Sequence, residues 1–206
     1  MGFGEIAKQA GVFALTVLVG GIGTYFVLFR HPKTAARQPI RLAVNADTVT
    51  LSGKSQAYQL VEFTDYQCPV CRAVEKQLPA VLLPYKGRVN LVVRNFPLSY
   101  HQYAFGAAVA AEAARAQGKF DVMHNALMAA PDLSAQSVRT IAIKNHLDMK
   151  RFDEDAKHSA ISRIILDKSE FNALHLPGTP TFLLCSPTGE VTELRQINQL
   201  GGLVKL

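Results

Sequence analysis

The chain of 206 residues contains no tryptophan and only three cysteines. Cys68 and Cys71 are three positions apart, whereas Cys185 is far from both. A structural zinc ion takes four ligands, so a single cysteine pair with scattered histidines argues against a zinc site. A disulfide that closes such a short loop stabilises a fold poorly, which makes a purely structural bridge the weaker alternative. We therefore expect no metal and no cofactor beyond the cysteine pair itself.

The chain also lacks a basic stripe. Its net charge is +6, and +4 of this comes from Arg30, Lys33, Arg37 and Arg41, which leaves +2 for all other residues. Such a distribution argues against a nucleic-acid-binding surface. The short basic segment is instead typical of a polar tether that also contacts lipid headgroups.

Residues 10–29 lack charge altogether and are apolar apart from two threonines and four glycines. Twenty residues of α-helix span roughly 30 Å, the thickness of a bilayer's hydrocarbon core. We therefore expect a transmembrane anchor at 10–29, after a short N-terminal segment at 1–9 and before a basic tether at 30–41. A cleaved signal peptide is the alternative, although Glu5 and a single lysine make a poor positively charged start.

Residues 42–206 are predicted to form one globular domain of the α/β class. Its first half is expected to contain strands at Leu42–Leu51, Tyr58–Thr64 and Val89–Arg94, and a helix from Pro69 to about Leu83. Proline suits the first turn of a helix, where its missing N–H is not needed. Pro79 falls inside the same helical pattern, so we expect a kink there.

The second half of the domain is predicted to be helical at about 101–174. Ser134 and Asp148 are candidate N-caps within this insert, because their side-chain oxygens can accept backbone N–H groups at a helix start. A β-hairpin is then expected from Thr181–Cys185 and Val191–Leu194, joined by a turn rich in Ser, Pro and Gly. No internal repeat or low-complexity segment is apparent.

The segment Cys68-Pro69-Val70-Cys71 carries the strongest chemical signal. Two thiols one helical turn apart can alternate between dithiol and disulfide without large backbone motion. Cys68 lies at the expected helix start, where unpaired N–H groups and the helix dipole favour a thiolate. Favouring the thiolate stabilises the reduced form and makes the oxidised form a stronger oxidant. Cys71 lies one turn into the helix, so we expect a buried and protonated thiol.

Several segments together resemble the DsbA-like thiol–disulfide oxidoreductases of the thioredoxin fold. They are Phe63-Thr64-Asp65-Tyr66-Gln67 before the cysteine pair, Asn95-Phe96-Pro97-Leu98 with His101, Gln117-Gly118-Lys119-Phe120, and Gly178-Thr179-Pro180-Thr181. The resemblance covers roughly residues 45–195. It implies a thioredoxin fold with a helical insertion, here preceded by an N-terminal transmembrane helix.

The resemblance also implies roles for individual residues. Cys68 matches the exposed nucleophile, and Cys71 matches the buried resolving cysteine. Pro180 matches the cis-proline that faces the disulfide, so Thr179 and Pro180 are expected to bind substrate together with Pro69 and Val70. Glu62 matches a buried acid beneath the active site, which would carry the proton of Cys71. The dipeptide between the cysteines lacks the histidine of the most oxidising members, and the C-terminal helix is expected to be very short.

These features predict a membrane-anchored enzyme that forms disulfides in cysteine-containing substrate proteins and is then reoxidised by a membrane redox partner. Disulfides persist outside the cytoplasm, so we expect the domain on the extracytoplasmic side. The basic residues after the anchor argue weakly against this orientation. A reductase of extracytoplasmic thiols is the first alternative, since only the two reduction potentials decide the direction. A non-catalytic, membrane-tethered binding module is the second.

Overall fold

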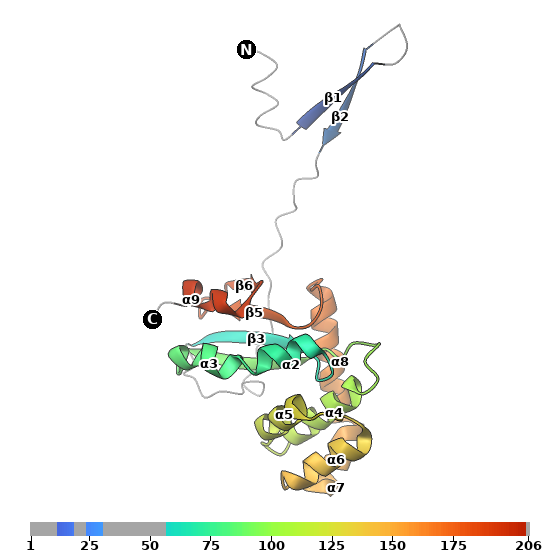
Figure 1. Ribbon diagram of the computed structural model, residues 1–206, viewed down its shortest axis with the longest axis vertical. Coiled ribbons are helices and arrows are strands. Elements are labelled where there is room, and N and C mark those ends of the chain that lie inside the picture. Colours follow the sequence, from blue (N-terminus) through green and yellow to red (C-terminus); the bar gives the residue numbers. More distant parts are fainter. Residues whose placement is uncertain (1–11, 19–23, 31–56, 205–206) are drawn as a thin grey trace. The chain divides into compact units, whose positions relative to one another are not determined.

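The computed structural model describes residues 12–18, 24–30 and 57–204 (Figure 1). The chain divides into two units, Met1–Gln38 and Pro39–Leu206. The strand predicted at Leu42–Leu51 lies outside the described residues, as does the predicted boundary between tether and domain. The functional residues predicted from the sequence all belong to the second unit.

The described part of the first unit is a pair of antiparallel strands and not the predicted helix. β1 (Val12–Leu18) pairs with β2 (Thr24–Arg30), with Leu18 opposite Thr24 and Val12 opposite Arg30. Among the described residues, no helix has both the length and the apolar character needed to cross a membrane. The run is rich in valine, phenylalanine and threonine, which favour strands. An apolar run without periodicity does not distinguish the two structures.

The second unit contains a four-stranded mixed sheet in the order β4-β3-β5-β6. The central strand β3 (Tyr58–Thr64) runs parallel to β4 (Val89–Asn95) and antiparallel to β5 (Thr181–Cys185). β5 and β6 (Val191–Leu194) form the predicted hairpin. A 3₁₀ turn η3 (Ile197–Gln199) and the four-residue helix α9 (Leu200–Leu203) follow, so the closing helix is as short as predicted.

The connection from β3 to β4 carries the cysteine pair. It consists of α2 (Pro69–Glu75), α3 (Leu78–Leu82) and a 3₁₀ turn η2 (Leu83–Tyr85). The single kinked helix predicted for this region is thus two helices, which are separated after Glu75. Pro79 lies in the first turn of α3, where a proline requires no hydrogen-bond donor. The break leaves α2 as a short helix, which begins a few residues after the end of the central strand β3.

Between β4 and β5 the chain forms a helical insert. Its helices are α4 (Ala104–Arg115), α5 (Phe120–Ala129), α6 (Ala135–Lys144), α7 (Met149–Lys157) and α8 (Ser159–Ala173). The two predicted N-caps are confirmed: Ser134 accepts the Ser137 N–H, and Asp148 accepts two N–H groups at the start of α7. This arrangement of mixed sheet and helices is the predicted thioredoxin fold with a helical insertion.

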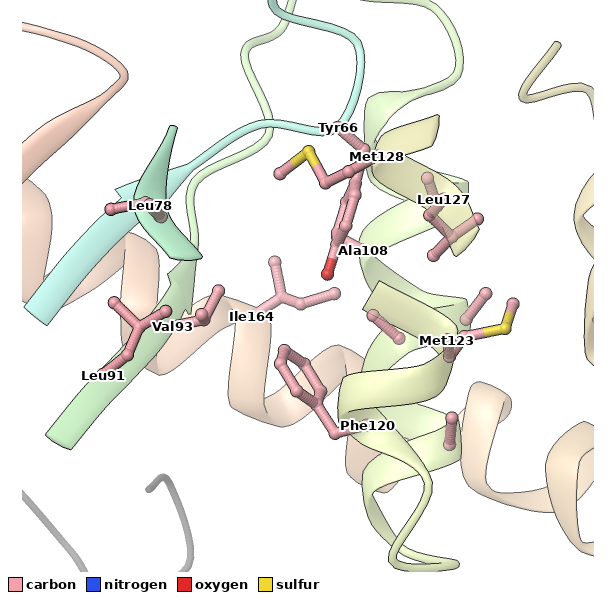
Figure 2. Close-up of a cluster of buried hydrophobic side chains, with 14 of the residues drawn as sticks. Tyr66, Leu78, Leu91, Val93, Ala108, Phe120, Met123, Leu127, Met128 and Ile164 are labelled. Carbon is pink, nitrogen blue, oxygen red and sulfur yellow. The ribbon is translucent and has the colours of Figure 1, made fainter. Parts of the chain in front are cut away.

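The sheet separates two apolar clusters, because successive side chains of a strand point to opposite faces. On one face, Leu60, Leu91 and Val93 pack with side chains from α3, α5 and α8. Figure 2 shows part of this cluster, including Leu78, Leu91, Val93, Phe120, Met123 and Ile164. On the other face, Val61, Phe63 and Leu183 pack against Phe171 of α8, whose ring centre lies 5.3 Å from that of Phe63. Val74 of α2 also packs against the first cluster, so the helix that carries the cysteine pair lies on the first face.

Candidate active site

The two cysteines lie at the start of α2, directly after the loop that follows the central strand. Cys68 is the N-cap residue and Cys71 lies in the first turn, and both are free thiols. Cys71 is fully buried, whereas Cys68 retains 6% exposure. Cys68 is thus more buried than the exposed nucleophile that the resemblance implies. The residues between them, Pro69 and Val70, are exposed, so the turn itself faces solvent.

The Thr179–Pro180 segment lies next to Cys68, 111 positions away in the sequence. The Cys68 thiol donates to the Thr179 carbonyl oxygen at 3.7 Å. The peptide bond between Thr179 and Pro180 is cis, as predicted. Both residues are partly exposed and precede β5. The fold therefore brings together the cysteine pair and the proline segment that sequence analysis singled out separately.

The environment of Cys71 keeps its thiol protonated. Burial raises the pKa of Cys71 to about 12, although interactions with the Thr64 side chain, the Asp65 backbone and the Thr179 side chain lower it in part. A thiolate at Cys71 is therefore short-lived at neutral pH, and it takes up a proton from whichever acid is near. A buried thiol that stays protonated is suited to the role of the resolving cysteine.

Glu62 supplies a buried acid on the same face of the sheet. Its side chain is fully buried on β3, as predicted. Burial, and to a smaller extent the Glu75 carboxylate, raise the pKa of Glu62 to about 8, although the Thr64 side chain lowers it in part. At neutral pH the carboxyl group of Glu62 holds a proton that it can donate.

Asp65 fixes the loop that carries Cys68. One carboxylate oxygen accepts the backbone N–H groups of Gln67 at 2.7 Å and Cys68 at 3.1 Å. The other accepts the Leu98 N–H at 2.8 Å and lies 2.9 Å from Nδ1 of His101. Four hydrogen bonds satisfy a carboxylate that is almost completely buried. Asp65 therefore joins the cysteine turn to the loop that precedes α4.

Sequence analysis did not assign Asp65 a role, although it lies within one of the motifs of the resemblance. His101 was noted only for its position in another of those motifs. The two residues are 36 positions apart, and nothing in a single sequence shows that they are in contact. The sequence signal for this contact was that Asp65 and His101, an acid and a base, lie in two separate motifs of the same family resemblance.

A second set of polar contacts joins Tyr66, His124 and Glu75. The buried Tyr66 hydroxyl and Nδ1 of His124 are 2.9 Å apart, and Nε2 of His124 lies 3.3 Å from a Glu75 oxygen. Burial raises the pKa of Tyr66 well above its usual value, so the hydroxyl stays protonated at neutral pH. These contacts connect α2 to α5 of the helical insert.

Cys185 does not belong to the site. It lies on β5 and is buried in the apolar cluster on the face of the sheet away from α2. Burial raises the pKa of Cys185 to about 11, so this thiol stays protonated and unreactive at neutral pH. Within the described part of the chain, no group of three or more His, Cys, Asp or Glu side chains is placed to hold a metal ion.

The mixed sheet, the cysteine pair at a helix start and the cis-proline beside it define a DsbA-like thiol–disulfide oxidoreductase of thioredoxin fold. A family model described as thioredoxin matches residues 45–203. The chain belongs to this thioredoxin family.

Similarity to known proteins extends over most of the domain. The thioredoxin-like oxidoreductase from Silicibacter pomeroyi DSS-3 superimposes with a TM-score of 0.63 and 27% identity, over 77% of this chain and 95% of that chain. Oxidised BdbD from Bacillus subtilis has the same fold, with a TM-score of 0.65 and 18% identity, over 80% of this chain and 94% of that one.

The curated relatives carry a different name. The Na(+)/H(+) antiporter NhaA 3 of Salinispora tropica is 32% identical over 199 residues, which are 88% of this chain and 30% of that protein. The chain therefore spans about 30% of the length of this relative, and 21% to 30% of the other curated relatives it matches.

Proposed function

We propose that this chain forms disulfide bonds in cysteine-containing proteins by cycling Cys68 and Cys71 between dithiol and disulfide. The observation that carries the proposal is the position of the Cys68 thiol, at the N-terminus of α2 and 3.7 Å from the carbonyl oxygen of Thr179 beside the cis-proline. An extended substrate that pairs with this segment brings its own sulfur to Cys68.

In the first step, a substrate thiolate attacks the Cys68 sulfur of the Cys68–Cys71 disulfide. The bond between the two cysteines breaks, and a mixed disulfide forms between substrate and Cys68. Cys71 leaves as a thiolate, and its high pKa draws a proton to it. Glu62, whose pKa of about 8 keeps it protonated at neutral pH, supplies that proton.

In the second step, a second thiolate of the substrate attacks the substrate sulfur of the mixed disulfide. The substrate disulfide forms, and Cys68 leaves as a thiolate that is favoured by its place at the helix start. The pair has then gained two electrons: Cys68 is a thiolate, and Cys71 carries the proton that Glu62 supplied. A membrane redox partner accepts the two electrons and restores the disulfide, and the proton of Cys71 returns to Glu62.

Four residues are proposed to contact the substrate. Pro69 and Val70 are exposed between the cysteines, and 56% of Val70 is accessible to solvent. Thr179 and Pro180 are partly exposed on the other side of Cys68. Together they border the one sulfur of the pair that retains exposure.

We further propose that residues 10–29 attach the chain to a membrane and that the domain works on the extracytoplasmic side. The support is the composition of this segment, which has no charge and is followed by a basic tether. Disulfide formation also requires a compartment in which disulfides persist. The basic residues after this segment favour a cytoplasmic domain. Large domains are nevertheless translocated across membranes despite such a charge bias.

Trapping the mixed disulfide tests the proposed cycle. The Cys71→Ala variant, when incubated with a peptide disulfide, is expected to accumulate a covalent adduct on Cys68 that mass spectrometry detects. The Cys68→Ala variant is expected to form none, since the fully buried Cys71 is not accessible. An adduct of equal yield on Cys71 in the Cys68→Ala variant would show that the roles of the two cysteines are assigned wrongly.

One observation favours the reverse direction, the reduction of extracytoplasmic disulfides. The Asp65 carboxylate accepts the backbone N–H of Cys68 at 3.1 Å and brings negative charge close to that residue. A nearby negative charge disfavours a thiolate and so lowers the reduction potential. A potential near that of thioredoxin, about −270 mV, would support this second function.

A further inference from the structure

His101 is a histidine that the proposed catalytic cycle does not use, although it lies beside the cysteine turn. It belongs to the loop between β4 and α4, and its Nδ1 atom lies 2.9 Å from a carboxylate oxygen of Asp65. The Tyr100 ring contacts the imidazole edge to face, with 4.6 Å between the ring centres. The side chain of His101 is 16% exposed, whereas that of Asp65 is fully buried. The imidazole is therefore the outer member of a pair whose inner member contacts Cys68.

The surroundings of Asp65 determine which atom of this pair carries the proton. The carboxylate accepts three backbone N–H groups, those of Gln67, Cys68 and Leu98. An ionised carboxylate only accepts hydrogen bonds, so its fourth partner has to be a donor. Nδ1 of His101 therefore carries a hydrogen and donates it to Asp65, whether the imidazole as a whole is neutral or charged.

Asp65 connects this hydrogen bond to the start of α2. Its other oxygen accepts the N–H of Cys68 at 3.1 Å, and Cys68 is the N-cap residue of the helix. A negative charge at this position disfavours the Cys68 thiolate, which the helix start favours. A donor on the far oxygen draws negative charge away from the near one, because hydrogen bonds in a network polarise one another. His101 thus weakens the influence of Asp65 on the sulfur.

Two cations also lie near the cysteine turn, but their hydrogen bonds are to the backbone. Arg72 and Lys168 each donate to a backbone carbonyl oxygen, at 3.0 Å and 3.3 Å. Among the residues that the structure describes, the side chain that forms an ion pair with Asp65 is the imidazole of His101. The negative charge beside Cys68 is therefore offset chiefly by His101.

We propose that His101 is a positioning residue of the redox reaction, which acts through Asp65 to raise the reduction potential of the cysteine pair. This inference rests on the proposed function and adds to it a residue that sets how strongly the pair oxidises. His101 transfers neither electrons nor protons to the substrate. It keeps the Asp65 carboxylate bound on both sides, and so keeps Cys68 a better leaving group when the substrate disulfide forms.

Replacing His101 with alanine in the full chain tests this role. Because Asp65 keeps its charge and loses its side-chain donor, we expect the equilibrium with glutathione to shift by about fivefold toward the disulfide, which corresponds to about 20 mV. His101→Asn is expected to recover most of the wild-type equilibrium, because the amide nitrogen of asparagine can take the place of Nδ1 and also donates. Lys168→Gln is the matched control, since it removes a cation that contacts the same loop through a backbone oxygen. It is expected to leave the equilibrium unchanged.

The Asp65→Asn background decides whether the effect passes through the carboxylate. There, His101→Ala is expected to shift the equilibrium by less than about twofold, because the charge on which His101 acts is gone. An unchanged equilibrium in His101→Ala, a His101→Asn variant that shifts as far, or an equal shift in Lys168→Gln would overturn the assignment. A full fivefold shift in the Asp65→Asn background would overturn it as well.

Alkylation of Cys68 separates this inference from the proposed function. The Cys71→Ala variant cannot form the disulfide, and the pH at which iodoacetamide modifies its Cys68 at half the maximal rate follows the stability of the thiolate. We expect His101→Ala to raise that pH by about 0.7 in the Cys71→Ala background, the same fivefold change, even if the wild type oxidises no substrate. An unchanged alkylation profile would overturn the inference, even if the wild type oxidises its substrates.

Discussion

Two carboxyl groups that lie three residues apart have different environments beside the cysteine pair. Glu62 is buried on β3, and its pKa is raised to about 8 mainly by the loss of solvent. Asp65 is equally buried but accepts four hydrogen bonds, including one from Cys68. The first is therefore suited to exchange a proton, and the second to hold the loop in place.

Replacing Glu62 with glutamine is expected to stabilise the fold increasingly as the pH rises. Because the pKa of Glu62 is raised from 4.5 to about 8 on folding, the folded state holds a proton that the unfolded state has lost between these values. The free energy of unfolding of the wild type therefore falls through this window. Glutamine removes this dependence, so its advantage should grow by about 3 kcal/mol between pH 5 and pH 7.5. Urea unfolding at both values measures it, and an advantage independent of pH would contradict the raised pKa.

Replacing Asp65 with asparagine is expected to make the chain a stronger oxidant. The side-chain oxygen can still accept the Gln67 and Cys68 N–H groups, but the negative charge near Cys68 is lost. We expect the equilibrium constant with glutathione to shift by about tenfold toward the dithiol, which corresponds to about 30 mV. Asp132→Asn, an exposed carboxylate at the start of α6, serves as the control. An unchanged or lower potential in Asp65→Asn would refute the effect of the charge.

The sequence was informative about a single residue where the residue's chemical type alone indicates its role, as for a cysteine pair or a proline. The cysteine pair was visible in the sequence itself. The resemblance helped to predict the burial of Glu62 and the cis bond before Pro180. The contact between Asp65 and His101 was not predicted. It depends on the packing of two loops that are distant in sequence, which periodicity and composition do not report.

At the scale of secondary structure elements, a buried ionic network joins the helical insert to the sheet. Arg94 on β4 contacts Asp167 of α8 at 2.9 Å, and Asp167 also accepts the backbone N–H of Asn95. The Asn95 side chain donates to Glu112 of α4 at 2.6 Å. β4 leads into the loop that contains Leu98 and His101, which contact Asp65, so the network also helps to fix this loop beside the active site.

Removing Asp167 is expected to destabilise the domain strongly. In Asp167→Ala, the buried Arg94 loses its nearest carboxylate and the Asn95 N–H loses its acceptor. Breaking a buried pair on one side costs about 3 kcal/mol or more. Asp153→Ala breaks the exposed pair with Arg139 and should change the unfolding free energy far less. Similar losses in both variants would show that the buried network does not support the fold in this way.

Local signals predicted some elements well and misjudged others for a physical reason. Ser134 and Asp148 cap their helices as predicted, because capping depends on a side chain and its own backbone neighbours. Pro79 was predicted to kink one helix, but the chain instead starts a new helix around it. Whether a proline bends or interrupts a helix depends on the packing of both parts, and the sequence pattern is the same in each case.

At the scale of the whole molecule, the described strands β1 and β2 replace the helix predicted at 10–29. The prediction used the length and the lack of charge of the segment, and neither property specifies helix over strand. The domain that follows was predictable because several motifs jointly resemble one family. The aligned region covers 21% to 30% of the length of the curated relatives, so the chain corresponds to one part of these longer proteins.

The proposed attachment to a membrane is tested by fractionation. The full chain is expected to stay with membranes after an alkaline carbonate wash, because residues 10–29 form an uncharged, mainly apolar segment of twenty residues. A chain that begins at residue 42 is expected in the supernatant. Recovery of both proteins in the supernatant would contradict the attachment.

The redox equilibrium of the cysteine pair tests the central claim most directly. The full chain is equilibrated in glutathione buffers, free thiols are alkylated, and the mass shift is measured, since without tryptophan no indole signal reports the change. We predict that Cys68 and Cys71 oxidise together in one two-electron transition, with a midpoint above about −270 mV, while Cys185 stays a thiol. A chain in which Cys68 and Cys71 are modified independently, with no disulfide between them at any glutathione ratio, would contradict the account.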